Sequence, residues 1–385
     1  MIYLDHAAAT PVSAQALAAM QPYFAEQFFN PSAPYLAAKA VREAYEQAKD
    51  DLAHTIGAKG ADLIITSGAT ESINLAFTAI AQNKKAIRSL ILSTEHQAVR
   101  ATATQYGYSE IAVDRTGLIN LADLRAKLTS DIQLVSVALA NNELGTIQPL
   151  AEIATIIREE RARRLAEGDT TPLYLHSDAS QALSLVDINV ARLGVDLLTL
   201  NAAKVYGPKG VGALYLAHGV QLQPITYGGG QEMGLRSGTE NVPAVVGFAA
   251  AAQLAKQHTS GQRKKYQQLV QILRTELLQA KVEPLFLGSK KHQLANFCPV
   301  SFPGIDAERL IYKLEQQEIY LSTGAACAAS KGEKSQTLSA IGLSDTEIAG
   351  SLRISLGILN TEQDIRTAAR AIVQAVNAEA ERLGL

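Results

Sequence analysis

The chain has 385 residues, of which 47% are hydrophobic and 19% are charged, and its formal net charge is -2. This composition excludes an intrinsically disordered chain, and the near-neutral charge disfavours direct binding to nucleic acid or to an anionic membrane surface. No apolar run reaches the roughly 20 residues of a membrane span, and the first residues lack the pattern of a signal peptide, so we expect a cytoplasmic protein.

Short apolar runs alternate with helical stretches in the first part of the chain. The candidate strands are residues 63–66, 89–93, 132–138, 173–176, 197–200 and 212–216. Segments between them, such as residues 71–81 and 147–159, are amphipathic or rich in alanine and predict helices. This alternation predicts an α/β fold with a mostly parallel sheet and helices on both faces. Such sheets bind ligands on the loops beyond the carboxyl ends of their strands.

The character of the sequence changes after about residue 255. A helical stretch at 262–280 leads into a mixed segment with predicted strands at 296–302 and 352–355 and helices at 307–317 and 363–383. We therefore expect two domains. Residues 15–255 would form a large domain, and residues 1–14 and 256–385 a smaller α+β domain that carries the cysteine loop.

The chain has two cysteines, Cys298 and Cys327, and no CxxC motif, which argues against a disulfide framework and a structural zinc site. Each thiol is therefore either a packed small side chain or a nucleophile. Cys298 alternates with apolar residues and is interpreted as packed. Cys327 lies in a stretch of glycine, alanine, serine and charged residues that resembles a loop, which favours the nucleophile.

Three polar clusters follow predicted strands. The SGATES turn at 67–72 is suited to an anion at a helix N-terminus, or is equally well a simple helix cap. Asp178 ends a strand, where it either pairs with a cation such as a protonated heterocycle or caps the next helix. Lys204 lies among small residues, where desolvation would lower its pKa as Schiff-base chemistry requires, whereas Lys209 lies within the following turn.

Two single residues add to these clusters. His96 follows another strand, although a lone histidine is more often structural than catalytic. Arg353 lies in a strand-like run, so its guanidinium should meet a carboxylate from the protein or from a substrate.

The order and the amino-acid residues of these segments resemble those of the cysteine desulfurases of the NifS/IscS type, within the class V aminotransferase group. The matching pieces run along the whole chain and are YLDHAAATP, NPSAP, SGATES, TEHQAV, NNELG, HSDASQ, KVYGPKGVGALY, GGGQEMGLRSGTENV, TGAAC and RISLG. The resemblance implies a fold type I enzyme dependent on pyridoxal 5′-phosphate (PLP), with a mostly parallel seven-stranded sheet in its large domain. It also implies that L-cysteine is converted to L-alanine while its sulfur becomes a persulfide on the enzyme.

The resemblance also implies a role for each matching residue. Lys204 would hold PLP covalently and move the Cα proton, Asp178 would pair with the pyridinium nitrogen, and Gln181 would bond the phenolic oxygen. His96 would stack on the ring and assist proton transfer. Because an ordinary cysteine has a pKa of about 8.5 and the nucleophile must be a thiolate, we also hypothesise that His96 deprotonates the thiol. The phosphate contacts would come from Ala69, Thr70, Asn201 and, across a homodimer, Thr239.

On the substrate side, the resemblance implies that Asn142 and Arg353 bind the carboxylate, with Asn142 also close to the cofactor. Cys327 would attack the substrate Sγ. The length of the segment after the thiol is similar to that of the long-loop NifS/IscS subgroup.

One departure from the family concerns the phosphate pocket. Ser-Gly-His usually precedes the cofactor lysine, whereas this chain has Asn201, Ala202 and Ala203. Asn201 would replace one phosphate contact, but Ala203 cannot replace a histidine. Weaker PLP binding is one expectation, and another phosphate donor filling the gap is the alternative.

The sulfur acceptor is left open. IscS-type members carry a C-terminal tail that docks an iron–sulfur scaffold, and its absence here leaves room for another acceptor, such as a tRNA-thiolation enzyme. A selenocysteine lyase, another class V PLP enzyme and a catalytically degenerate PLP-binding protein are the alternative hypotheses.

Overall fold

The computed structural model describes residues 1–80, 88–324 and 334–385, so the predictions made for Cys327 lie outside the described residues. Its largest sheet has seven strands, and β8 is the strand that runs antiparallel to both of its neighbours. In their order across the sheet, the strands are β2 (Leu63–Thr66), β8 (Gly212–Leu216), β7 (Leu197–Asn201), β6 (Tyr174–Asp178), β5 (Ile132–Ser136), β3 (Arg88–Leu92) and β4 (Tyr108–Ile111). The predicted α/β fold with a mostly parallel sheet is confirmed.

Helices cover both faces of this sheet because successive strand residues point to opposite sides. Ile64 packs into a core with α4 (Ala69–Phe77) and α5 (Gln97–Tyr106) on one face. Its neighbours Leu63 and Ile65 belong to the core of the other face. The helices on that second face are α3 (Leu36–Thr55), α6 (Leu121–Lys127), α7 (Leu150–Ala166) and α9 (Val242–Leu277).

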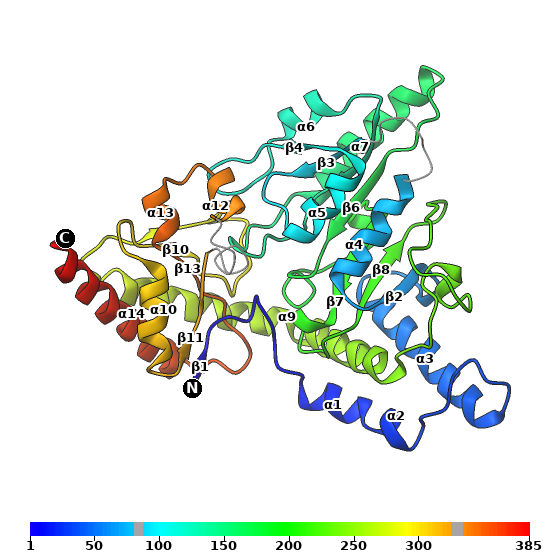
Figure 1. The fold of residues 1–385 in the computed structure, drawn as a ribbon, viewed down its shortest axis with the longest axis horizontal. Coiled ribbons are helices and arrows are strands. Elements are labelled where there is room, and N and C mark those ends of the chain that lie inside the picture. The colour runs from blue at the N-terminus through cyan, green and yellow to red at the C-terminus, as the bar shows by residue number, and fades with distance from the viewer. Residues whose placement is uncertain (81–87, 325–333) are drawn as a thin grey trace.

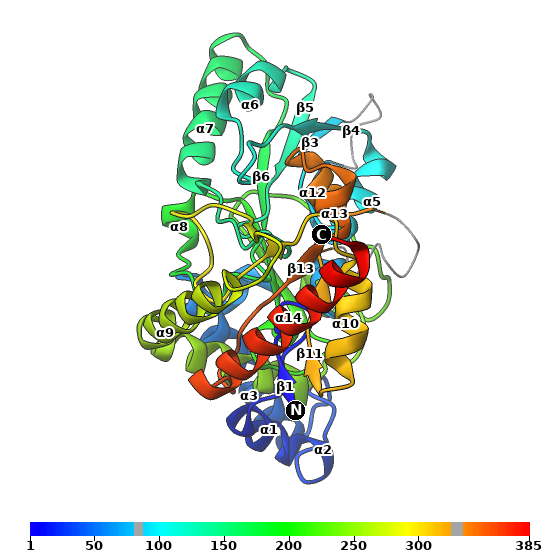
Figure 2. The ribbon, with the colours of Figure 1, turned by 90° about the vertical axis from the view of Figure 1, so that its left-hand side faces the viewer.

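The remainder of the C-terminal part forms a second layer, at the left in Figure 1. A four-stranded antiparallel sheet contains β12 (Ser322–Thr323), β13 (Ser351–Arg353), β10 (Val300–Ser301) and β9 (Leu285–Phe286) in that order. Its helices are α10 (Ala307–Glu315), α12 (Gln336–Ala340), α13 (Asp345–Ala349) and α14 (Glu362–Leu383). β1 (Ile2–Tyr3) pairs in parallel with β11 (Ile319–Tyr320), so the first residues of the chain lie in this layer. Figure 2 shows the two termini on the same side of the molecule.

Two predicted elements have different bounds in the structure. The helix expected at 262–280 is the second half of α9, which begins at Val242 and passes residue 255 without a break. Its first half contacts α1 (Ala14–Met20) and α3, whereas another part of it contacts α14, so α9 joins the two layers. The strand expected at 296–302 shortens to β10, because Pro299 has no N–H to donate to a neighbouring strand.

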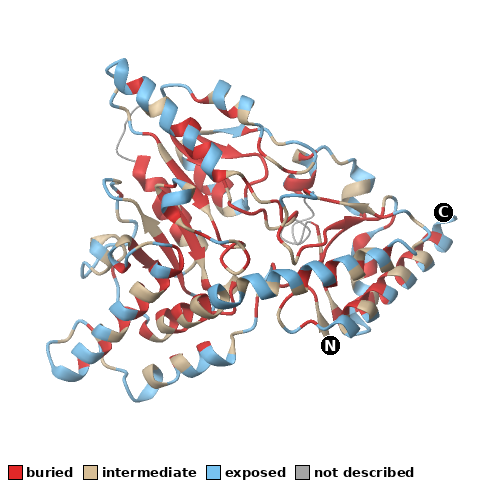
Figure 3. Ribbon diagram, turned by 180° about the vertical axis from the view of Figure 1, so that it is seen from behind, coloured by how far each residue is buried: buried red, intermediate tan, exposed pale blue. Residues whose placement is uncertain are grey.

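The strand β4 has no counterpart in the prediction. Only Ile111 among its residues is buried, because β4 lies at the edge of the sheet and exposes Ser109 and Glu110. Figure 3 shows the buried residues concentrated in the strands and on the inward faces of the helices. Within the described ranges, no helix has the length and apolar character needed to cross a membrane.

Candidate active site

A cavity of about 480 Å³ lies beyond the carboxyl ends of β5, β6 and β7. Its lining brings together the predicted residues Ala69, Thr70, His96, Asn142, Asp178, Gln181, Asn201, Lys204 and Arg353. Thr239 is exposed on the loop before α9 and does not line this cavity. Cys327, the predicted nucleophile, lies in the segment that the structure does not describe.

Lys204 reaches the cavity because a single helical turn, η3 (Ala202–Lys204), follows β7. The Asn201 side-chain oxygen accepts a hydrogen bond from the Ala203 N–H at 3.1 Å and so caps this turn. The Lys204 ammonium donates to the Ala7 carbonyl at 3.0 Å and also to the Ala8 carbonyl. These two carbonyls belong to the N-terminal YLDHAAATP segment, which therefore forms part of the lysine's surroundings.

Asp178 ends β6, the strand next to β7. Its Oδ1 accepts from the Ser180 N–H at 2.9 Å, and the following residues form turns rather than a helix. The alternative of a helix cap is therefore wrong, and the carboxylate lies in the same cavity as Lys204. Gln181 follows, and its amide donates to the Ala7 carbonyl at 2.9 Å.

The SGATES turn leads into α4 without a side-chain cap. The residue at the cap position is Gly68, whose φ of 151° favours glycine. Glu71 accepts from the Ser67 N–H at 2.6 Å and pairs with Arg236 at 3.0 Å, which ties the turn to the glycine-rich loop. The first amides of α4, at Ala69 and Thr70, thus face the cavity end where an anion would be favoured.

His96 caps α5, because its Nδ1 accepts from the Ala98 N–H at 3.0 Å. The neutral ring therefore carries its proton on Nε2. Burial lowers the pKa of His96, and the positive charges of Lys204 and Arg353 lower it further, against the opposing effect of Asp178. His96 is thus a neutral hydrogen-bond donor at pH 7.

Arg353 meets a carboxylate of the protein itself. Its Nη2 pairs with Asp5 Oδ1 at 2.7 Å, and its Nη1 donates to the Asn142 carbonyl at 3.4 Å. The Nε atom is buried with no hydrogen-bond partner among the described residues. A guanidinium has five N–H donors, so this pairing leaves donors for a second carboxylate in the cavity.

Comparisons with known proteins agree with this geometry. The model of the class-V aminotransferase family matches residues 2–367. The chain belongs to the class-V aminotransferase family. It is 38% identical over 373 residues to the cysteine desulfurase IscS 1 of Archaeoglobus fulgidus, covering 95% of this chain and 94% of that protein. It is 36% identical over 372 residues to the cysteine desulfurase IscS of Dictyoglomus turgidum, covering 94% and 91%.

A solved structure described as a NifS-like protein superposes with a TM-score of 0.89. It shares 30% identity, covering 98% of this chain and 99% of that chain. The similarity to the NifS/IscS-type cysteine desulfurases of this family is therefore confirmed over nearly the whole chain.

Class-V aminotransferases such as the cysteine desulfurases are PLP enzymes, and the residues of this cavity fit that cofactor. An amine and a carboxylate end neighbouring strands, and uncapped helix amides lie in the same cavity. PLP requires these three groups for its aldehyde, its pyridine nitrogen and its phosphate.

Sequence reasoning missed two carboxyl groups beside the site, that of Glu95, which is buried, and that of Glu143, which is half-buried. Glu95 Oε1 accepts from the Ala138 N–H at 2.6 Å, and burial raises its pKa to about 8, with the charge of Asp178 raising it further. Glu143 accepts from the Ser335 hydroxyl at 2.5 Å, and burial raises its pKa to about 6. Both lie within quoted motifs, TEHQAV and NNELG, but the motifs alone gave no sign that the pKa values of these side chains would be raised.

Cys298 is fully buried, as predicted. Burial raises the pKa of its thiol to about 11, although Arg274 opposes the shift. A thiol with this pKa holds almost no thiolate at pH 7, so Cys298 is unsuited to nucleophilic attack.

Proposed function

We propose that this class-V aminotransferase is a cysteine desulfurase that removes sulfur from L-cysteine and carries it as a persulfide on Cys327. The observation that carries the proposal is the single cavity shared by Lys204, Asp178, His96 and Arg353. The cysteine desulfurases among its relatives support the choice of reaction.

In this proposal, Arg353 and Asn142 bind the substrate carboxylate. Asp5 holds the guanidinium in place through Nη2, and Nη1, which donates one hydrogen to the Asn142 carbonyl, keeps a second N–H for the substrate carboxylate. Fixing the carboxylate orients the Cα–H bond toward Lys204, which takes and returns the proton. Bound PLP supplies an electron sink for the electrons released at Cα, and Asp178 maintains it by pairing with the pyridinium nitrogen.

His96 would act as a donor rather than as the base that takes the thiol proton. Its Nδ1 already accepts the Ala98 N–H, so the other nitrogen carries the hydrogen. We therefore assign His96 to stacking on the ring and to hydrogen-bond donation through Nε2, and assign deprotonation of Cys327 to another group.

The sulfur transfer balances without an external oxidant. The Cys327 thiolate forms an S–S bond to the substrate Sγ, and the Cβ–Sγ bond breaks. The electron pair of that bond goes to the carbon skeleton, which takes up a proton to become alanine. The enzyme sulfur is thereby oxidised to a persulfide while Cβ is reduced.

Mass spectrometry of the holoenzyme after addition of L-cysteine tests the proposal. We expect a mass increase of one sulfur atom on the peptide that contains Cys327, with an equal amount of alanine. Cys327→Ser should abolish both products, whereas the control Cys298→Ser should retain them. Alanine formation by Cys327→Ser at the normal rate would contradict the assignment of Cys327.

We also propose a homodimer in which Thr239 of one subunit contacts the phosphate held by the other. Thr239 is exposed outside its own cavity, and the apolar side chains of Tyr227 and Met233 are exposed on the same loop. Mixing Lys204→Ala with Thr239→Ala subunits provides a test. If Thr239 contacts the site of the other subunit, a hybrid dimer has one site that carries both substitutions and one site that carries neither. Its activity should then exceed that of the Lys204→Ala and Thr239→Ala homodimers. No recovery in the hybrid would place Thr239 in its own subunit.

The sulfur acceptor and the location in the cell belong to the same proposal. An iron–sulfur scaffold and a tRNA-thiolation enzyme are the two acceptor classes that we propose to test, with a cytoplasmic protein as the working hypothesis. Transfer of ³⁵S from the loaded enzyme to each purified acceptor would distinguish them. Turnover of selenocysteine but not cysteine would instead support the selenocysteine lyase alternative.

A further inference from the structure

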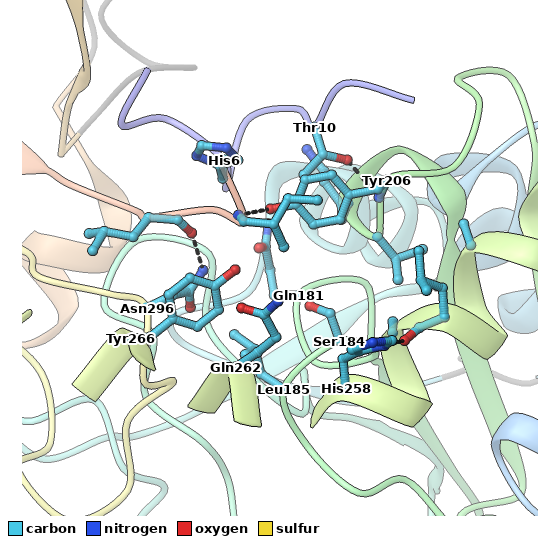
Figure 4. A pocket seen from close by; sticks show the side chains of 17 residues that line it. His6, Thr10, Gln181, Ser184, Leu185, Tyr206, His258, Gln262, Tyr266 and Asn296 are labelled. Carbon is cyan, nitrogen blue, oxygen red and sulfur yellow. Dashed lines mark hydrogen bonds between the residues drawn. The ribbon is translucent and has the colours of Figure 1, made fainter. Parts of the chain in front are cut away.

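Glu143 is an acidic residue beside the active site that has no role in the proposed mechanism. It follows Asn142, which lines the active-site cavity, in the loop between β5 and α7. A second cavity of about 200 Å³ lies behind Lys204 and Gln181, which line both cavities (Figure 4). Among the described residues, the lining of neither cavity includes Glu143. Any part that Glu143 has in the reaction is therefore indirect.

The backbone of Glu143 is held in a turn at residues 141–145. Asn141 is buried, its Oδ1 accepts from the Glu143 N–H at 2.8 Å, and its amide donates to the Thr94 carbonyl at 2.9 Å. The Asn142 carbonyl in the same turn accepts from Arg353 at 3.4 Å. This turn therefore has a fixed place relative to the two residues that we assign to the substrate carboxylate.

The side chain of Glu143 reaches the start of α12 in the second layer. Its Oε2 accepts from the Ser335 hydroxyl at 2.5 Å, and the Thr337 hydroxyl is hydrogen-bonded to the same carboxylate. Ser335 Oγ also accepts from the Leu338 N–H at 3.0 Å and so caps α12. Ser335 and Thr337 are only 2% and 3% exposed, so water does not compete for these bonds. The carboxylate thus fixes the first turn of α12 against the turn that contains Asn142.

The start of α12 also supports the described residues on both sides of the segment that contains Cys327. Ser335 follows Cys327 by eight positions, and Gly324 precedes it by three. Gly324 donates its N–H to the Ser351 carbonyl at 2.9 Å. It lies so close to α12 that a Cβ at this position would be 2.7 Å from Leu338 Cδ1. The places of both flanking residues therefore depend on the place of α12.

We propose that Glu143 is a positioning residue for sulfur transfer, which holds the start of α12, and with it the residues that flank the Cys327 segment, in a fixed place relative to the substrate. The inference rests on the proposed function, because Glu143 has this part only if Cys327 attacks the substrate. A misplacement of about 1 Å between reacting groups can cost about 10²-fold in rate. Loss of the carboxylate should therefore slow the attack on Sγ and spare proton transfer at Cα, which depends on Lys204.

Two measurements separate these steps. Exchange of the Cα hydrogen of L-alanine with solvent deuterium requires Lys204 and the cofactor but not the thiol. Persulfide formation in a single turnover with L-cysteine, followed by rapid quenching and mass spectrometry, requires Cys327 as well. In PLP-loaded Glu143→Ala, we expect persulfide formation to slow by at least about tenfold while exchange stays within about threefold of the parent rate.

Further variants test whether the contact with Ser335 carries the effect. Glu143→Gln keeps an oxygen for the Ser335 hydroxyl and should retain persulfide formation within about threefold. Ser335→Ala should slow it by about tenfold, and it provides the same test if Glu143→Ala does not fold. The double variant Glu143→Ala/Ser335→Ala should be no slower than the slower single variant, because both changes remove the same contact.

The matched control is Lys334→Ala, which breaks the exposed Lys334–Asp345 pair beside the same turn and should leave both rates unchanged. Persulfide formation at the parent rate in Glu143→Ala and Ser335→Ala would overturn the inference. Equal slowing of persulfide formation and exchange would also overturn it, because Glu143 would then act on the substrate-binding turn alone. Absence of the Cys327 persulfide from the parent enzyme would instead refute the proposed function, so the two failures are distinguishable.

Discussion

The two sides of the active-site cavity are built in different ways. On the sheet side, Asp178, His96 and Asn201 each bond a backbone N–H two residues further along the chain. On the other side, Arg353 pairs with Asp5 across 348 positions of sequence. These three sheet-side residues are thus fixed by local turns at strand ends, whereas the side that contains Arg353 forms only when distant segments meet.

The largest effect that we expect tests the sheet side. Lys204→Ala should lower cysteine turnover by at least about 10³-fold and remove the visible cofactor band, because both covalent attachment and proton transfer are lost. The control is Lys209→Ala, five residues further on, whose ammonium donates to the Thr10 carbonyl. Turnover and absorbance should survive in the control. A Lys204→Ala enzyme that remains yellow after dialysis and desulfurates cysteine would contradict the assignment.

The next effect tests the long-range side. Asp5→Ala should lower the free energy of unfolding by about 3 kcal/mol and raise KM for cysteine, because it leaves a buried guanidinium unpaired and unpositioned. The Asp187–Arg192 pair is the control, since its side chains are 66% and 65% exposed whereas those of Asp5 and Arg353 are 18% and 5% exposed. Asp187→Ala should change stability by less than about 0.5 kcal/mol. Urea unfolding of both variants gives the comparison, and equal losses would show that burial does not set the cost.

This difference also explains what the sequence could predict. The strand-end residues Asp178, Lys204 and His96 follow apolar runs directly, so their positions at one edge of the sheet follow from the α/β pattern. The pairing of Arg353 was expected only as a carboxylate from an unspecified source, because no local pattern links residue 5 to residue 353. The resemblance to a known family assigned roles to nine residues of the cavity lining, although it gave no reason to expect the raised pKa values of Glu95 and Glu143.

A smaller effect is expected at Glu95, the buried residue that precedes His96 in the turn after β3. The raised pKa of about 8, against an ordinary value of 4.5, means that the folded protein holds a proton there that the unfolded chain releases. Stability from this group is therefore full below about pH 4.5 and is lost as the pH rises through 8, with a slope of up to ~1.4 kcal/mol per pH unit.

Glu95→Gln should remove this slope, because the amide does not titrate. Thermal unfolding between pH 5.5 and 8.5 would measure it on parent and variant, with Glu283→Gln as the exposed-carboxylate control. An unchanged pH dependence in Glu95→Gln would show that Glu95 is ionised in the folded protein.

The smallest effect concerns the phosphate end of the sheet side. Ala203→His restores the residue that the family usually has before the lysine, so PLP should bind up to about tenfold more tightly if the pocket lacks a donor. Asn201→Ala removes the cap of η3 and should weaken binding by a similar factor. Equilibrium titration of the apoenzyme with PLP measures both. Unchanged affinity in Ala203→His would mean that another donor already fills the gap.

The parallel pairing of β1 with β11 has a consequence for biosynthesis. Residues 2 and 3 pair with residues 319 and 320, and Asp5 pairs with Arg353. The N-terminal segment therefore leaves the ribosome long before these partners have been synthesised. Contacts this distant in sequence form late and slow the folding of the chain. The Ala7 and Ala8 carbonyls that accept hydrogen bonds from Lys204 belong to the same N-terminal segment. A nascent chain therefore completes the surroundings of its lysine only near the end of synthesis, which delays a finished cofactor site until the whole enzyme is present.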